Sequence, residues 1–166
     1  MSIEQQAERI LEAAKAGNLT IVTAESCTAG AVATALSKAP GAGNHFHGGF
    51  VTYTKPMKNI VLGVPLKLLK HKGAVCKEVA EAMAIGALKM ARANIAVAVT
   101  GVAGPEPDED ENPVGLVFCS AARSNRKAVT ARHLFEGLSR EAVINASVEE
   151  TLKLLEIELM NIRKGQ

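Results

Sequence analysis

The sequence predicts a layered α/β domain with a mixed β-sheet. Stretches with the apolar spacing of amphipathic helices alternate with short runs of apolar and β-branched residues typical of buried strands. Two such runs, residues 114–121 and 128–135, are joined by a Ser-Asn-Arg turn that favours a hairpin. A connection that tight requires antiparallel neighbours, so the sheet cannot be wholly parallel. The length of 166 residues suits a single domain over residues 1–166.

In the first half of the chain, periodicity and turn residues mark out the elements in order. Apolar residues at helical spacing run from Ile3 to Ala14, and Gly17 ends that helix. A β-branched run then predicts a buried strand over residues 19–23. The segments that follow are a small-residue helix at about 27–36, a strand at 48–53, and short helices at 58–62 and 66–70.

The second half of the chain continues this alternation. An apolar stripe from Val79 to Met90 predicts a helix over residues 77–92. Residues 95–99 are apolar throughout, which predicts a strand that is covered on both faces. The segments that follow are a turn at 101–105, an acidic loop at 106–111, the two hairpin strands, and a closing helix with apolar residues at helical spacing over 148–162.

Charge and composition exclude several classes of function. The chain carries 19 basic and 17 acidic residues, without the basic excess of a nucleic-acid-binding protein. No apolar run reaches the ~20 residues that span a bilayer, and the start of the chain lacks the apolar core of a signal peptide. Three cysteines without a Cys-x-x-Cys pair indicate free thiols. We therefore expect a cytoplasmic protein that binds neither nucleic acid nor membranes.

Three segments contain residues able to do chemistry, and the first is Glu25 to Gly30. It joins a strand to a helix, where unpaired backbone N–H groups and the positive end of the helix dipole converge. Ser26 there either caps the helix or acts as a nucleophile whose oxyanion those donors hold. Serine is a favoured capping residue, so this segment taken alone favours the cap.

The second segment, residues 53–58, contains Tyr53 and Lys58 at the end of a predicted strand. A serine nucleophile needs a base, and a lysine can serve when burial lowers its pKa. Taken alone, the segment is better explained by a core tyrosine beside solvated lysines.

The third segment, residues 100–105, reads Thr-Gly-Val-Ala-Gly-Pro directly after a predicted strand. Glycine-bearing turns at this end of a sheet bind ligands in many α/β proteins, because their amides hold phosphate or carboxylate groups. An ordinary tight turn explains the segment equally well.

In their order and spacing, these segments resemble the CinA carboxy-terminal domain family. That family combines Ala-Glu-Ser-Cys-Thr-Gly-Gly after a strand, a Gly-Gly-x-Val-x-Tyr strand with a lysine five residues past the tyrosine, and Thr-Gly-Ile-Ala-Gly-Pro. The matching stretches of this chain are residues 24–30, 40–41, 48–58, 62–64, 73–75, 100–105 and 113–115. The resemblance runs from about Leu11 to Leu155 and outweighs the explanations given for each segment alone.

The resemblance implies a three-layer α/β/α domain with a mixed sheet, and a serine hydrolase that removes the amide of nicotinamide mononucleotide. It assigns the nucleophile to Ser26, the general base to Lys58 and an assisting role to Tyr53. The residues expected to bind substrate are Thr28, Gly49, Thr100, Gly101, Ala103, Gly104 and Arg140. It calls for no cofactor and no metal. The expected partner is a small nucleotide substrate, and a homo-oligomer is compatible with the sequence.

Departures from the family pattern leave a rival interpretation open. Ala29 replaces the second glycine of the nucleophile motif, and the loop at 106–111 carries five carboxylates where the family has glycines. Carboxylates beside a phosphate site repel the substrate unless they point to solvent. This loop favours a non-catalytic nucleotide-binding or competence-associated regulatory module, whereas the retained Ser26, Tyr53 and Lys58 favour the enzyme. Cys27 is a second candidate nucleophile, because a helix N-terminus lowers the pKa of a thiol.

Overall fold

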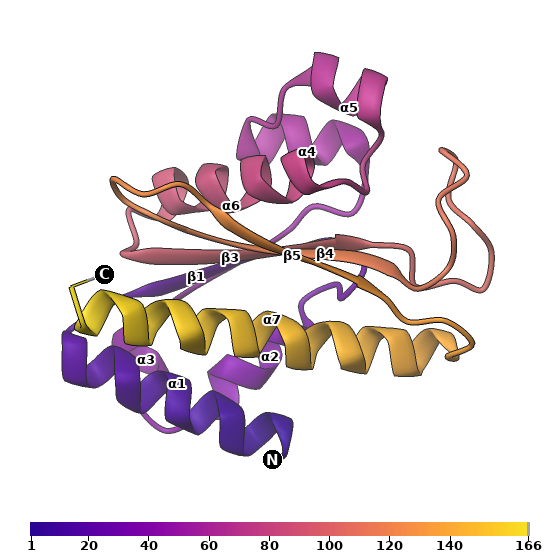
Figure 1. Cartoon of the computed structure of the whole chain (residues 1–166). Coiled ribbons are helices and arrows are strands. Elements are labelled where there is room, and N and C mark those ends of the chain that lie inside the picture. Colours follow the sequence, from indigo (N-terminus) through magenta and orange to yellow (C-terminus); the bar gives the residue numbers. More distant parts are fainter. Residues whose placement is uncertain (166) are drawn as a thin grey trace.

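The structure, a computed structural model that describes residues 1–165, contains a five-stranded sheet with helices on both faces (Figure 1). The strands are β1 (Ile21–Glu25), β2 (Phe46–Val51), β3 (Ile95–Gly101), β4 (Leu116–Arg123) and β5 (Val129–Leu134). Their spatial order is β2-β1-β3-β4-β5. β1 is parallel to both of its neighbours, whereas β4 is antiparallel to β3 and β5. The mixed sheet and the hairpin predicted from the sequence are confirmed.

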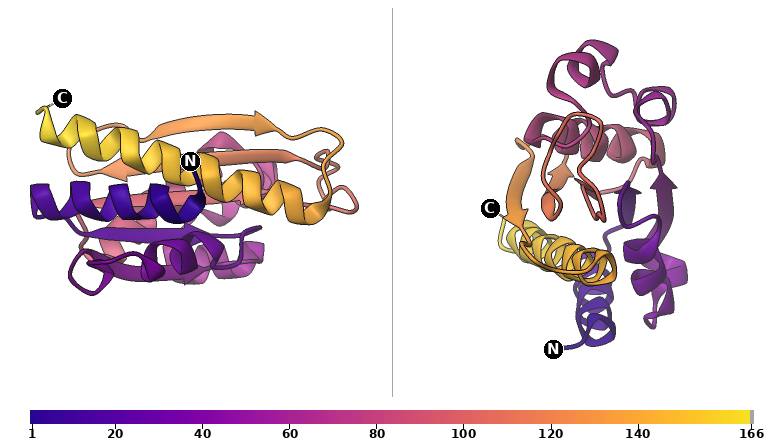
Figure 2. Two further views of the ribbon diagram at one scale, coloured as in Figure 1. Left: turned by 90° about the horizontal axis from the view of Figure 1, so that it is seen from below. Right: turned by 90° about the vertical axis from the view of Figure 1, so that its right-hand side faces the viewer.

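Helices make this sheet the middle of three layers, as the right-hand view of Figure 2 also shows. One face carries α6 (Lys77–Ala91), with α4 (Lys55–Leu62) and α5 (Leu66–Lys72) beside it. The other face carries α7 (Arg140–Arg163), α1 (Ile3–Gly17), α2 (Ala31–Lys38) and the short α3 (Ala42–His45). The three-layer α/β/α arrangement implied by the family resemblance is therefore confirmed. Within residues 1–165, the helices are all too short or too polar to cross a membrane.

The apolar core is divided by β3, which lies in the middle of the sheet. Ile95, Val97 and Val99 join the apolar cluster on the side of α1 and α7. Ala96 and Ala98 join the cluster beneath α6. This alternation has the period of two expected of a strand. The continuous apolar run at this point in the sequence is thus explained by cover on both faces.

Two element ends differ from the prediction in a way that shapes the site. The strand predicted at 48–53 begins at Phe46 and ends at Val51. α4 begins at Lys55 instead of residue 58, because the Thr54 hydroxyl caps it and supplies the acceptor that the first turn lacks. Lys58 therefore lies inside a capped helix, where its backbone is held, and not at a frayed end.

The closing helix is longer than its apolar stripe indicated. α7 begins at Arg140, where the Ser139 hydroxyl accepts the N–H of Ala142. Its first turns extend beyond the sheet toward the end of the molecule at which the loop after β3 lies (Figure 1). Arg140 is brought to that end by this extension.

Candidate active site

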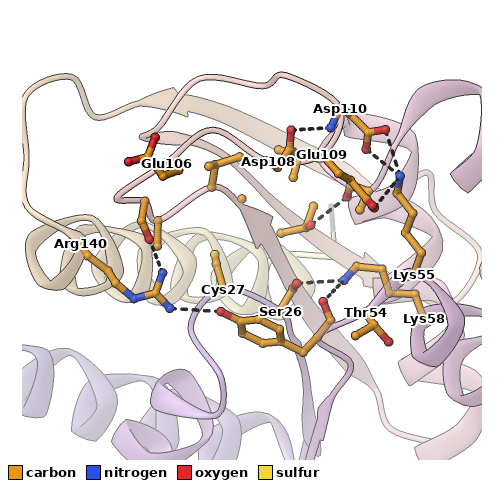
Figure 3. A pocket seen from close by; sticks show the side chains of 18 of the residues that line it. Ser26, Cys27, Thr54, Lys55, Lys58, Glu106, Asp108, Glu109, Asp110 and Arg140 are labelled. Atoms are coloured by element: carbon orange, nitrogen blue, oxygen red, sulfur yellow. Dashed lines mark hydrogen bonds and ion pairs between the residues drawn. The ribbon is translucent and has the colours of Figure 1, made fainter.

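A pocket of about 660 Å³ opens at the carboxyl ends of the parallel strands (Figure 3). Ligands of open α/β sheets bind at this edge, because the turns leaving the strands meet there. The predicted site residues that line the pocket are Ser26, Tyr53, Lys58, Thr100, Gly101, Ala103, Gly104 and Arg140. The fold thus brings together residues that the sequence separates by more than a hundred positions.

Lys58 and Ser26 are in direct contact within this pocket. The Lys58 side chain is buried, and its Nζ donates hydrogen bonds of 2.8 Å to Ser26 Oγ and to the carbonyl oxygen of Thr52. Burial lowers the pKa of Lys58 from its ordinary 10.5 to about 8. Among the described residues, no carboxylate forms an ion pair with Lys58 that would oppose this shift. In its neutral form, the amine can accept the serine proton across the same contact.

The turn that presents Ser26 is organised by Glu25. α2 begins at Ala31, four residues later than predicted from the small-residue pattern, because residues 26–30 form a turn. The buried Glu25 carboxylate caps the helix, accepting the N–H groups of Gly30, Val32 and Ala33. The local sequence favoured Ser26 as the residue that caps this helix, and that prediction is wrong. The Ser26 hydroxyl instead contacts Lys58.

Two residues expected to bind substrate lie outside the pocket lining. Thr28 is buried, and its hydroxyl donates to the Glu25 carboxylate over 2.6 Å. Gly49 lies inside β2 opposite Thr23, and a methyl group at that position would come within 2.4 Å of the Thr23 hydroxyl oxygen. Thr28 supports the turn and Gly49 permits close packing, and a role for either in substrate binding stays a prediction. Neither residue lines the pocket that contains Ser26.

The hydroxyl of Tyr53 contacts Arg140 and not Lys58. Arg140 Nη2 donates to the Tyr53 hydroxyl over 3.1 Å, and Nη1 donates to the carbonyl oxygen of Gly104. Only the backbone carbonyl of Tyr53 approaches Lys58 Nζ, at 3.5 Å. Arg140 and Lys55 lie at opposite ends of the pocket (Figure 3). The structure thus brings Tyr53 to the site, in contact with a different partner from the one expected.

The end of β3 and the turn that follows it, residues 100–104, line the pocket. The Thr100 hydroxyl donates to the carbonyl oxygen of Ala74, which ties the turn to the loop before α6. A methyl group on Gly101 would come within 2.8 Å of the carbonyl oxygen of Leu116. Gly104 has φ of +92°, which a residue with a side chain rarely adopts. These constraints explain the glycines. The N–H of Val102 bonds the carbonyl oxygen of Leu116, so the N–H groups that the turn can offer a ligand are those of Ala103 and Gly104.

Residues 106–111, called the acidic strap below, cover the side of the pocket opposite Ser26 (Figure 3). Lys55 Nζ pairs with Glu109 and Asp110, each at 2.8 Å, and these partners raise the pKa of Lys55. Asp108 shapes the strap by accepting two backbone N–H groups of its own loop. Sequence reasoning missed Lys55, because only the folded chain brings together positions 55 and 110.

Cys27, the second candidate nucleophile, is buried beside Ser26. Burial raises the pKa of its thiol to about 12. The start of α2 does not offset this effect, because Glu25 occupies its N–H groups. The expected lowering of the thiol pKa is therefore wrong, and Cys27 stays protonated at neutral pH.

Fold and pocket together define a three-layer α/β/α protein in which a serine and a buried lysine are in contact at the ends of parallel strands. The CinA C-terminal domain matches residues 3–159 of this chain. The chain therefore belongs to the CinA C-terminal domain family, as its motifs indicated.

Relatives and solved structures agree with this membership. Nicotinamide-nucleotide amidohydrolase PncC of Escherichia coli strain K12 is 40% identical over 91% of each chain. A CinA-like protein of Geotalea uraniireducens is 41% identical over 89% of this chain, which spans 34% of that protein. The crystal structure of the competence/damage inducible protein CihA of Agrobacterium tumefaciens is 40% identical, covers 95% of this chain and 94% of its own, and has a TM-score of 0.90. A CinA superfamily protein from Escherichia coli is 35% identical, with a TM-score of 0.89 over 94% of this chain and 90% of its own.

Proposed function

We propose that this protein hydrolyses the carboxamide of nicotinamide mononucleotide, giving nicotinate mononucleotide and ammonia. The observation that carries the proposal is the 2.8 Å contact between Ser26 Oγ and the buried Lys58 Nζ. The relative from Escherichia coli, at 40% identity over 91% of the chain, supplies the substrate class. The proposal treats residues 1–166 as one amidohydrolase domain of the cytoplasm, where its three cysteines remain thiols.

The reaction begins when Ser26 Oγ attacks the amide carbon while neutral Lys58 takes the hydroxyl proton. The carbonyl oxygen becomes an oxyanion in a tetrahedral intermediate. The intermediate collapses as the C–N bond breaks, and protonated Lys58 gives its proton to the nitrogen that leaves as ammonia. Water then attacks the acyl-enzyme, with Lys58 as its base, and releases the carboxylic acid and Ser26. The proposed chemistry requires no cofactor and no metal.

Substrate binding in this proposal relies on the end of the pocket opposite Lys55. The phosphate is held by the Arg140 guanidinium and by the backbone N–H groups of Ala103 and Gly104, which line the same pocket as Ser26. Tyr53 assists by fixing the guanidinium through their 3.1 Å hydrogen bond. The pocket volume of about 660 Å³ falls in the range of small-molecule sites.

The regulatory-module alternative gains no support from the Ser26–Lys58 pair. A buried lysine without a carboxylate partner destabilises the folded protein, and a module that only binds a nucleotide has no need of such a base. An assay of ammonia release from nicotinamide mononucleotide, nicotinamide and NAD tests the proposal, with release expected chiefly from the mononucleotide. Tight binding of the mononucleotide without any release of ammonia would favour the regulatory module and refute the enzyme.

A further inference from the structure

Glu25 is a buried carboxylate that no step of the proposed reaction uses. It lies one residue before the nucleophile, and it is 1% exposed. The donors to its two oxygens are the hydroxyls of Thr23 (3.3 Å) and Thr28 (2.6 Å) and the N–H groups of Gly30 (3.0 Å), Val32 (3.0 Å) and Ala33 (2.8 Å). A carboxylate is costly to bury unless such donors satisfy it. These five hydrogen bonds hold the Glu25 carboxylate in one position within the fold.

These bonds decide which N–H groups near Ser26 remain for an oxyanion. The start of α2 is fully used, because Glu25 takes three of its N–H groups and the N–H of Ala31 bonds the carbonyl oxygen of Thr28. The N–H of Ser26 itself bonds the carbonyl oxygen of Val99. Over residues 26–33, the N–H groups that donate to no oxygen of the described chain are those of Cys27 and Thr28. Cys27 also lines the pocket.

The turn that contains these two N–H groups needs an external support. Ala29 has φ of +48°, a left-handed conformation that a residue with a Cβ adopts only at an energetic cost. The Glu25 carboxylate binds this turn on both sides of Ala29, through the Thr28 hydroxyl and the Gly30 N–H. Its hydrogen bonds therefore oppose relaxation of the turn.

We propose that Glu25 is a positioning residue that forms the oxyanion hole of the Ser26 site. By binding the start of α2 and the Thr28 hydroxyl, it holds residues 26–30 so that the N–H of Cys27, assisted by that of Thr28, meets the oxyanion. Acyl-transfer enzymes commonly use the N–H that follows the nucleophile for this purpose. The inference rests on the proposed function, because it concerns the intermediate that attack by Ser26 creates.

The decisive variant is Glu25→Gln, which keeps the size of the side chain. Each Glu25 oxygen accepts at least one backbone N–H, so the amide NH₂ of glutamine must face a donor in either orientation. We expect kcat to fall about a hundredfold, as when an oxyanion donor is lost. KM and the pH at which Lys58 loses its proton should stay within experimental scatter of the wild type, because neither the substrate contacts nor Lys58 is changed.

A milder variant tests the same proposal if the Glu25→Gln protein does not fold. Thr28→Val removes only the hydroxyl that donates over 2.6 Å to the carboxylate, and kcat is expected to fall about tenfold. Thr151→Val is the matched control, because it removes an equally buried hydroxyl that bonds the carbonyl oxygen of Ser147 within α7. The Thr151→Val protein should be less stable than the wild type and should keep the wild-type kcat.

A fluorophosphonate probe separates this inference from the choice of substrate. Ser26 Oγ forms a bond to phosphorus, the P–F bond breaks, fluoride leaves and Lys58 takes the serine proton. The P=O oxygen gains negative charge in that step, so labelling also depends on the oxyanion hole. The labelling rate of Thr28→Val and of folded Glu25→Gln should fall in parallel with kcat.

Each outcome decides a different claim. Wild-type labelling without ammonia release refutes the proposed substrate, and the labelling rates of the variants then decide the role of Glu25. Variants that are labelled at the wild-type rate, or that lose kcat no more than Thr151→Val does, overturn the inference. A wild type that neither releases ammonia nor reacts with the probe overturns both the function and the inference.

Discussion

The Arg140 guanidinium and the Tyr53 hydroxyl are joined by a 3.1 Å hydrogen bond at one end of the pocket. The guanidinium also donates to the carbonyl oxygen of Gly104, so two contacts from different parts of the chain fix its plane. A guanidinium held in this way is preorganised for an anion, because little side-chain freedom remains to be lost on binding.

Arg140→Ala is therefore expected to lower kcat/KM for nicotinamide mononucleotide by about ten- to a hundredfold, the usual loss for one or two charge-assisted hydrogen bonds. Tyr53→Phe should lower it less and in the same direction. Nicotinamide riboside, which lacks the phosphate, should be a poor substrate and nearly indifferent to Arg140→Ala. Steady-state kinetics on both substrates check this, and equal wild-type rates for the two would exclude phosphate recognition.

Ser26→Ala is expected to abolish amide hydrolysis while the protein stays folded. The Ser26 hydroxyl does not cap α2, so its loss leaves the helix start intact. Cys27→Ala should retain turnover of the same order as the wild type, because burial raises the pKa of that thiol to about 12 and keeps it protonated. Ammonia release and circular dichroism measure both effects. Turnover by folded Ser26→Ala at the wild-type rate would refute the serine mechanism.

The pH dependence of kcat/KM should follow the protonation of Lys58. The pKa of this lysine is lowered to about 8, and only the neutral amine can accept the serine proton. The rate should therefore rise as pH increases through about 8 and level off above it. Lys58→Arg should be nearly inactive throughout, because a guanidinium stays charged. A pH profile that is flat between pH 7 and 9 would contradict Lys58 as the base.

Lys58→Met is expected to be inactive and more stable than the wild type at pH 7. The lowered pKa of Lys58, about 8 against the ordinary 10.5, means that its burial costs the charged form about 3 kcal/mol at neutral pH. Lost hydrogen bonds to Ser26 and Thr52 offset part of that gain.

The sign of the linked pH dependence follows from the same pKa difference. Between pH 8 and 10.5 the unfolded chain holds a proton on Lys58 that the folded chain has released, so wild-type stability rises with pH in this window. The stability advantage of Lys58→Met should therefore narrow across it. Urea unfolding at pH 7, 8.5 and 10 measures the difference in free energy of unfolding between Lys58→Met and the wild type. A difference that does not change with pH would count against the burial of a charged lysine.

The acidic strap should be dispensable for turnover of the mononucleotide. Replacing residues 106–111 with a short glycine-containing turn removes carboxylates that repel a phosphate and releases Lys55 from its ion pairs. We expect kcat/KM to stay level or rise, and the gain to shrink at high salt because salt screens these charges. A tenfold fall at every salt concentration would show that the strap contributes to the reaction itself.

Local patterns were enough to predict much of the fold, but they did not predict the central pair of the site. The uninterrupted apolar run at 95–99 predicted a strand with cover on both faces, and β3 has that cover. The contact between Ser26 and Lys58 was predicted only through the family resemblance, because residues 32 positions apart carry no periodicity that links them.

Features that depend on tertiary contacts could not be predicted from the sequence. The small residues after Glu25 have the composition of a helix, so nothing local showed that a carboxylate would hold them in a turn and delay α2 to Ala31. The ion pair between Lys55 and Asp110 depends on where a long loop returns to the sheet. The one signal available for Glu25 was its position, a charged residue at the end of a buried strand.

α4 carries both the proposed base and the residue that fastens the acidic strap. Lys58 faces Ser26, while Lys55, one turn earlier on this helix, holds Glu109 and Asp110. A rigid-body movement of α4 away from the sheet would withdraw the base from the serine and uncover the pocket in the same step. Such a movement would open the pocket to solvent and deprive Ser26 of its base at the same time. A protein opened for product release would then hold a serine that is not activated for attack.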